Sequence, residues 1–277
     1  MFAYSFMQRA LIAIILLGII LPIIGLNMTT KRLSMIGDTL SHTSLCGIAL
    51  GLAAGTMPTV WAIGVSIVAG IIIEIVRNHF KKYSELTLSI VMSTAVGVAG
   101  ILTSKWASGN KIESYLFGSL ITVQWDSIWI IIGVSIITIL FNLIFYRTIM
   151  YTSYSESEAR ISGVPVKAMN LINTILVACV VAVASSIIGS LLVSSLLVIP
   201  VASSLQLCKS YKFTMLSSII ISLICSVSGL CISYPLSINT GGTIVLMATA
   251  ILILSIIYKF ILKNLFKSKA LERSKSA

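Results

Sequence analysis

The chain has 277 residues, of which 57% are hydrophobic and 10% are charged, and its mean hydropathy is +1.07. This composition excludes a soluble globular protein and a disordered chain, and it is typical of polytopic membrane proteins. The net charge of +11 is compatible with a nucleic-acid partner only if the basic residues cluster on one binding surface. Their distribution along the chain argues against such a partner.

Apolar segments of similar length follow one another from the first residues to the last. Each is long enough for a helix to cross about 30 Å of hydrocarbon. They cover residues 8–27, 36–56, 58–78, 86–104, 127–147, 169–187, 188–207, 213–233 and 242–261. The sequence therefore predicts an all-α fold, a polytopic transmembrane bundle of about eight or nine spans. We expect one integral membrane domain over residues 1–262 and a basic cytoplasmic tail over residues 263–277.

The basic residues fix the orientation of these spans. If the amino terminus lies outside, sixteen Lys and Arg residues fall on the inner side, and three fall outside: Arg9, Lys105 and Lys111. Such an excess follows the positive-inside rule. It predicts an external amino terminus, a cytoplasmic carboxyl terminus and a tail attracted to the anionic lipid bilayer. The positive charge thus reflects topology, and no nucleic-acid partner is expected.

Asp38 and His42 interrupt the second apolar segment. They are four residues apart, so on a helix they share one face. Ionisable side chains inside a bilayer are costly, and a carboxylate with an imidazole forms half of a site for a divalent transition metal. Cys46, four residues further, is a candidate third ligand. The alternative is a polar pair bonded to neighbouring Ser or Thr side chains. A helix continuous from Arg32 would place Asp38 about 9 Å and His42 about 15 Å inside the membrane.

Three glycines follow this pair at intervals of four: Gly47, Gly51 and Gly55. Overlapping GxxxG steps in apolar sequence allow close helix packing. At about 100° per residue these glycines lie on the side of the helix away from Asp38. We expect one face of this helix to pack tightly while the other faces a pathway.

Glu74 and His79 lie at the inner end of the third segment, beside Arg77. Helix-end salt bridges are the expected role for both. Residues 113–125, on the outer side, contain an apolar stretch too short to span, which suggests a re-entrant or interfacial element.

The inner loop at residues 155–165 is polar and is predicted to form a brief helix that ends near Gly163. Such a helix could be the contact for a subunit that drives transport, or the loop could be a solvated connector. Further on, Ser190 and Ser194 share a helix face in a segment that also contains Pro200. These residues could line a gate or could allow close packing.

No catalytic signature is present in the sequence. It contains no G-x-x-x-x-G-K-[ST] motif for nucleotide phosphates, no H-E-x-x-H motif and no G-x-S-x-G motif. The chain is therefore not expected to be an enzyme. If ATP drives its activity, another chain must hydrolyse that ATP.

The chain resembles the permease subunits of ABC-type zinc and manganese importers, the ABC-3 metal permease family. Three stretches carry the resemblance: KRLSMIGDTLSHTSLCGIALG at 31–51, YLFGSL at 115–120 and IGSLLVSSLLVIPV at 188–201. The resemblance implies a homodimer in the bacterial inner membrane, a cytoplasmic ATP-binding subunit and an extracytoplasmic metal-binding protein. It also implies that the metal pathway runs along Asp38 and His42, and that Glu158, Ala159 and Gly163 belong to the ATPase-coupling loop. No permanently bound cofactor is expected, since Zn²⁺ or Mn²⁺ would be the substrate.

The details at residues 6–10 and 38–42 look closer to zinc importers, so zinc is the expected substrate. Aspartate–histidine pairs also suit manganese, and a manganese or iron permease is the alternative. An ion-coupled secondary transporter is a further alternative, but inverted repeats and acids in several spans are not evident. A two-fold dimer would bring a second Asp38 and His42 to the axis and complete four ligands.

Overall fold

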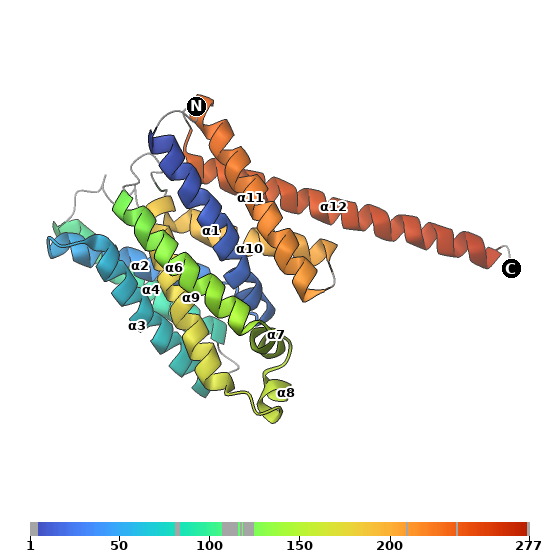
Figure 1. The fold of residues 1–277 in the computed structure, drawn as a ribbon, viewed down its shortest axis with the longest axis horizontal. Helices are drawn as coiled ribbons and strands as arrows, with labels where there is room; N and C mark the ends of the chain where they lie inside the picture. The colour runs from blue at the N-terminus through green and yellow to red at the C-terminus, as the bar shows by residue number, and fades with distance from the viewer. Residues whose placement is uncertain are drawn as a thin grey trace.

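The computed structural model describes residues 5–80, 84–106, 116, 118, 125–208, 210–236 and 238–275, and in these ranges it contains helices and no strand. The chain forms a bundle from which its last helix projects (Figure 1). The helices are α1 (Ser5–Thr30), α2 (Ile36–Ala53), α3 (Pro58–His79), α4 (Ser84–Trp106), α6 (Trp125–Ile144), α7 (Tyr146–Tyr154), α8 (Glu156–Ile161), α9 (Val166–Ile188), α10 (Ser190–Leu207), α11 (Tyr211–Leu236) and α12 (Thr240–Lys275).

Eight helices in the described part of the chain are long and apolar enough to cross a membrane: α1, α3, α4, α6, α9, α10, α11 and α12. These helices confirm the predicted all-α, polytopic fold. The 18-residue α2 falls outside this group because Asp38, His42 and several hydroxyl side chains lower its hydropathy. It is nevertheless packed into the bundle, where α3, α4, α9 and α10 contact it.

The core of the bundle lies where α1, α9 and α10 meet. About 72% of the apolar window of α1 and 67% of that of α9 are buried, against 17% for α4 and α12. Large side chains of the inner helices, such as Leu17, Leu21 and Leu197, are almost fully buried. The peripheral helices direct apolar side chains outward, as expected for helices in contact with lipid. The helix α2, which contacts α9 and α10 as well as α4, therefore lies between the buried core and the lipid-facing layer.

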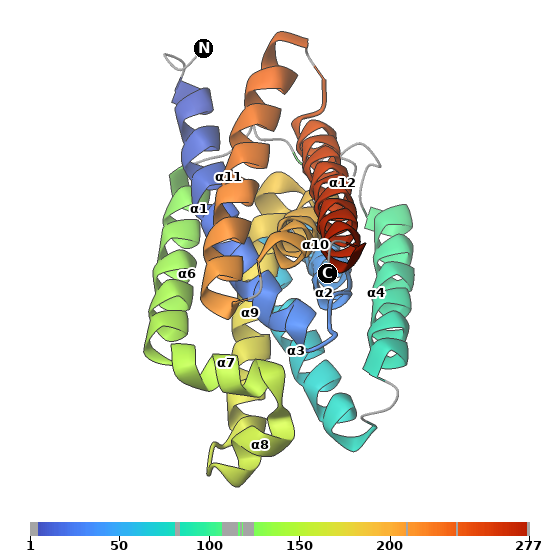
Figure 2. The same cartoon turned by 90° about the vertical axis from the view of Figure 1, so that its right-hand side faces the viewer.

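One end of the bundle gathers the short helices and several helix termini. In Figure 2, α7 and α8 lie at the same end as the last turns of α3 and the start of α9. Contacts of Lys31 (after α1) and Arg77 (near the end of α3) both reach this region. Because α1 and α3 both end here, α2 must lead the chain away from this end and α3 must bring it back. The basic residues make this the cytoplasmic end.

The helix α12 runs without a break across the predicted boundary at residue 262. Its apolar part extends over Thr240–Ile261, and the helix continues to Lys275 beyond the bundle (Figure 1). Most of the predicted re-entrant element at residues 113–125 lies outside the described residues. A Cβ on Gly118, which is described, would overlap the carbonyl oxygen of Ile188, so this point of the outer segment touches the end of α9.

Candidate functional site

The turn before α2 differs from the continuous helix that the depth estimate assumed. The helix α1 ends at Thr30, and Arg32 adopts φ of 59°. The Leu33 N–H donates to the carbonyl of Met28, and the Arg32 N–H donates to that of Thr29. This is the Schellman arrangement, formed here with arginine in the position that glycine usually takes. Since α2 begins only at Ile36, the depths of about 9 and 15 Å calculated from Arg32 do not hold.

Asp38 and His42 lie in the first two turns of α2, and both are half-buried. Among the described residues, neither the carboxylate of Asp38 nor the ring of His42 has a hydrogen-bond or ion-pair partner. The alternative expectation, that neighbouring Ser or Thr side chains satisfy this pair, is therefore wrong for the part of the chain that is described. Within the described residues, an acid and an imidazole thus lie unpaired on one face of α2.

Polar contacts hold the other sides of α2. They are side-chain hydrogen bonds to three neighbouring helices: Thr39 Oγ1 to Leu88 O of α4 (3.3 Å), Ser66 Oγ of α3 to Leu40 O (3.4 Å), and Ser44 Oγ with Ser185 Oγ of α9 (2.5 Å). At about 100° per residue, these positions fall between about 100° and 240° around the helix from Asp38. His42 falls only about 40° away, so the pair occupies the sector that these bonds leave open.

Cys46 does not join the pair. It is buried and packs with Ala95 and Ala99 of α4. In the described ranges, no group of three or more His, Cys, Asp or Glu side chains is arranged to hold a metal ion. In this conformation Cys46 is a packing residue, and Asp38 and His42 remain as the two candidate ligands predicted on α2.

The three predicted packing glycines behave differently. A Cβ on Gly47 would lie 2.6 Å from the carbonyl oxygen of Trp61, and one on Gly51 would lie 2.7 Å from the Cα of Pro58. Only glycine allows α2 to approach the backbone of α3 so closely. The prediction of a packing role is wrong for Gly55, which lies beyond the end of α2 and has φ of +66°. A Cβ on Gly55 would meet nothing within 4 Å. It forms a Schellman turn in which the Thr56 N–H donates to the carbonyl of Gly51.

The predicted lining residues lie on α10. The hydroxyl of Ser190 is buried and has no partner in the described structure, whereas Ser194 Oγ donates to the carbonyl of Ser190 (3.3 Å). A Cβ on Gly37 would lie 3.8 Å from the Cα of Ser194, so α10 passes beside the first turn of α2. Pro200 is buried, and α10 continues through it to Leu207. Of these residues, Ser194 is the one that the structure brings close to the start of α2.

The short helix predicted in the inner loop is α8. Ser155 caps it by accepting a hydrogen bond from the Glu158 N–H (3.3 Å), and Gly163 follows its end with φ of +81°. Ala159 is almost fully buried, whereas Glu158 is exposed and Ile161 has 87% of its surface exposed. Ile161 is thus a large apolar side chain exposed on a helix outside the membrane spans.

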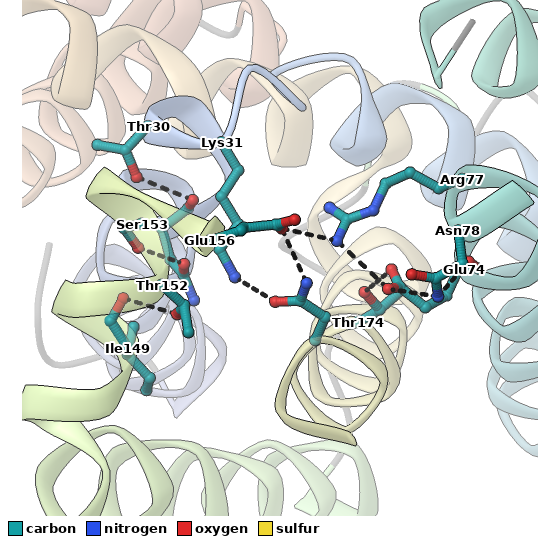
Figure 3. A network of polar contacts seen from close by, with 12 residues as sticks. Thr30, Lys31, Glu74, Arg77, Asn78, Ile149, Thr152, Ser153, Glu156 and Thr174 are labelled. Atoms are coloured by element: carbon teal, nitrogen blue, oxygen red, sulfur yellow. Dashed lines mark hydrogen bonds and ion pairs between the residues drawn. The ribbon is translucent and has the colours of Figure 1, made fainter. Parts of the chain in front are cut away.

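A polar network near α8 was not predicted (Figure 3). Glu156 Oε1 accepts hydrogen bonds from Arg77 (3.1 Å) and from the amide of Asn170 (2.9 Å), and Asn170 Oδ1 accepts one from Lys31 Nζ (2.7 Å). Arg77 also pairs with the buried Glu74 (3.3 Å), which confirms the helix-end salt bridge expected there.

His79, for which a salt bridge was also expected, instead contacts the carbonyl of Ile75 (3.1 Å) and forms no ion pair within the described ranges. Of the two ion pairs described in this network, only the pair of Glu74 with Arg77 joins residues that are close enough in sequence for the pairing to be predicted.

Lys31 is partly enclosed by this network. Burial, and then the positive charge of Arg77, lower the pKa of Lys31 from 10.5 to about 8, while Glu156 and Glu74 offset part of the shift. Between pH 8 and pH 10.5 the unfolded chain binds more protons at this position than the folded chain. Folding stability from this group must therefore rise with pH through that window, and the cost of burying the charge is fully present below pH 8.

We predict that wild-type protein gains thermal stability relative to a Lys31→Met variant as pH rises from 7 to 10. The reason is that the variant lacks the buried ammonium group, so its stability carries no contribution from this titration. Melting temperatures of the two purified proteins in the same detergent, compared at each pH, measure the effect. A difference between the two proteins that stays constant over this range would contradict the assignment.

Comparison with known proteins identifies the family. Residues 3–259 match the model of the ABC 3 transport family. The chain is 32% identical over 256 residues to a probable metal transport system membrane protein of Treponema pallidum, covering 92% of this chain and 96% of that protein. It is 30% identical to the manganese import system permease protein ScaB of Streptococcus gordonii (91% of each chain covered). It is also 26% identical to the high-affinity zinc uptake system membrane protein ZnuB of Haemophilus influenzae (91% and 97% covered).

The fold agrees with this assignment. The solved structure described as PsaBC from Streptococcus pneumoniae in complex with Fab superposes with a TM-score of 0.81 at 28% identity, and 91% of each chain is covered. The family also explains why no catalytic motif is present, since a permease is the membrane subunit of such a transporter and ATP is hydrolysed elsewhere. The chain belongs to the ABC 3 transport family, and it is a multi-pass membrane permease subunit of an ABC transporter.

Proposed function

We propose that this permease imports a divalent transition-metal ion, which passes α2 by way of Asp38 and His42. The observation that carries the proposal is the pair itself: a carboxylate and an imidazole one turn apart, with no partner among the described residues, in an otherwise apolar helical bundle. Unpaired ionisable groups are costly within a membrane, and a cationic substrate that binds them offsets that cost. Both donor types suit zinc and manganese.

Two ligands from one chain suit transient binding, because a permeating ion must be released again. A second copy of the chain, related by a two-fold axis, would supply another Asp38 and His42 and complete four ligands. The sector of α2 left open beside this pair is consistent with such an arrangement. Ser194, which lies beside the first turn of α2, is a candidate for lining the pathway next to the ligands.

The proposed ligands do not distinguish zinc from manganese, because a carboxylate and an imidazole can bind either ion. Several relatives named for manganese import and one named for zinc uptake each match about nine-tenths of the chain, so similarity does not favour the zinc branch suggested by residues 6–10 and 38–42. We retain zinc as the proposed substrate, with manganese as the alternative.

The transporter would include two further subunits, an ATP-binding subunit on the cytoplasmic side and a metal-binding protein outside. We place the ATPase contact at α8, with Glu158 and Ile161 at its surface and with Ala159 and Gly163 fixing its position. The support is the exposure of Ile161, which lies outside the membrane spans and so is not covered by lipid.

Metal-resolved uptake in cells tests the substrate. A strain without other zinc or manganese importers would express the permease and its partner subunits, and cellular metal would be measured under zinc or manganese limitation. Zinc accumulation by the wild type, lost in His42→Ala, is the expected result. If manganese alone accumulates, the zinc assignment is wrong and metal import stands. If neither metal accumulates, the proposed function is contradicted.

A further inference from the structure

Glu156 links α8 to two transmembrane helices at the cytoplasmic end of the bundle. It is the first residue of α8, and a single oxygen of its carboxylate accepts hydrogen bonds from α3 and α9 (Figure 3). The helix α8 has only six residues, and Ala159 is its only buried one among those described. Besides its covalent links to α7 and α9, α8 is therefore joined to the transmembrane helices by the hydrogen bonds of the Glu156 side chain.

The other end of the network lies in the turn that precedes α2. Asn170, which donates to Glu156, also accepts a hydrogen bond on its Oδ1 from the ammonium group of Lys31 (2.7 Å). Lys31 follows α1 directly and belongs to the short turn that leads into α2 at Ile36, two residues before Asp38. The turn is held by the Schellman hydrogen bonds and by the buried Leu33. A displacement of Lys31 therefore moves the start of α2 as well.

The charges of the network balance. Two cations, Lys31 and Arg77, face two carboxylates, Glu156 and Glu74, and Glu74 is almost fully buried. The buried Glu74 is tied to Arg77, Asn78 and Thr174, within α3 and α9. Among the described residues, Glu156 is the one carboxylate that connects these helices to α8. If its charge is lost, Lys31 and Arg77 remain close together with one counter-charge for two cations.

We propose that Glu156 is a positioning residue that couples α8 to α2: movement of α8 reaches Asp38 and His42 through Asn170 and Lys31. This inference rests on the proposed function, in which α8 receives the ATPase. The network is a contiguous path of short polar contacts, and a carboxylate that bridges two donors on different helices transmits displacement in both directions. The fold alone does not require such a bridge, because the chain already connects α8 directly to α7 and α9.

The test measures coupling in the complete transporter. Permease, ATPase subunit and metal-binding protein would be reconstituted in liposomes, and metal ions accumulated per ATP hydrolysed would be compared for wild type and Glu156→Gln. We expect the ATPase subunit to remain bound and ATP to be hydrolysed, while the ratio of metal to ATP falls at least about fivefold. Glu85→Gln is the matched control: it removes an exposed carboxylate at the cytoplasmic start of α4 and should leave the ratio unchanged.

A purely structural role for Glu156 predicts a different result. Metal transport and ATP hydrolysis would then fall together, and the ratio of metal to ATP would be preserved. That outcome would overturn the inference, and so would wild-type values of both rates. If Glu156→Gln does not fold, Lys31→Met decides, because it breaks the same path at its far end and keeps the pair of Glu156 with Arg77. It should lower the ratio in the same way, and an unchanged ratio overturns the inference.

Failure of the proposed function is recognised separately. Ile161→Asp places a charge at the exposed tip of α8 and should weaken binding of the ATPase subunit, measured by co-purification. Unchanged binding in that variant would show that α8 is not the ATPase contact. Unchanged coupling in Glu156→Gln, with Ile161→Asp defective in binding, would refute only the coupling role of Glu156.

Discussion

Asp38→Asn and His42→Ala should each reduce ATP-driven metal uptake at least about tenfold while leaving the fold intact. Both side chains are half-buried and have no partner in the described structure, so their loss breaks no internal hydrogen bond or ion pair. Each variant removes one of the two metal ligands that we propose for each chain. Initial uptake rates in proteoliposomes containing the complete transporter measure the effect, with ATP hydrolysis recorded in parallel.

The chain offers matched controls for both substitutions, because it contains one other aspartate and one other histidine. Asp126 is exposed at the start of α6, and His79 is exposed at the end of α3. Asp126→Asn and His79→Ala should transport metal at wild-type rates. If the Asp38 and His42 variants also transport normally, the pathway lies elsewhere and the proposed role of α2 is wrong.

Gly47→Ala should destabilise the permease by about 1–3 kcal/mol, because a methyl group there is forced against the backbone of α3. Its Cβ would lie 2.6 Å from the carbonyl oxygen of Trp61 and 2.7 Å from the Cα of Ala62. These are backbone atoms and cannot rotate away, so α2 and α3 must separate. The displaced helix carries both proposed metal ligands, and uptake should fall as well. Thermal unfolding of the purified variant measures the loss of stability.

Gly64→Ala is the control for this substitution. Gly64 lies within α3, and a Cβ there would meet nothing within 4 Å. Since alanine is the better helix former, this variant should be as stable as the wild type or up to about 1 kcal/mol more stable. Equal stability of Gly47→Ala and Gly64→Ala would mean that the close approach of α2 and α3 does not constrain the fold.

Hydropathy predicted most of the helices because a membrane span requires a fixed length of apolar sequence. It placed the start of α2 at residue 36, as observed, but it did not predict the end of α2 at Ala53 or the turn that precedes Ile36. The turn before Ile36 depends on Arg32 in a left-handed conformation, which the sequence does not signal because glycine usually takes that position. Gly55 matches the GxxxG spacing, but spacing alone cannot distinguish a glycine within a helix from one that terminates it.

The cytoplasmic network could not be predicted for a different reason. Its contacts join residues far apart in the chain: Lys31 and Asn170 are separated by 139 positions, and Arg77 and Glu156 by 79. Charge patterning places all of these residues at the cytoplasmic end, but it does not select partners. The pair of Glu74 and Arg77 could be foreseen because three residues on one helix bring side chains together.

Anomalous X-ray diffraction from the metal-loaded transporter tests the central claim most directly. Data collected at the zinc and manganese absorption edges would locate the ion and identify it. The account predicts an anomalous peak beside α2, with a zinc ion within about 2.0–2.2 Å of a carboxylate oxygen of Asp38 and an imidazole nitrogen of His42. A peak in the membrane bundle distant from both side chains would contradict it.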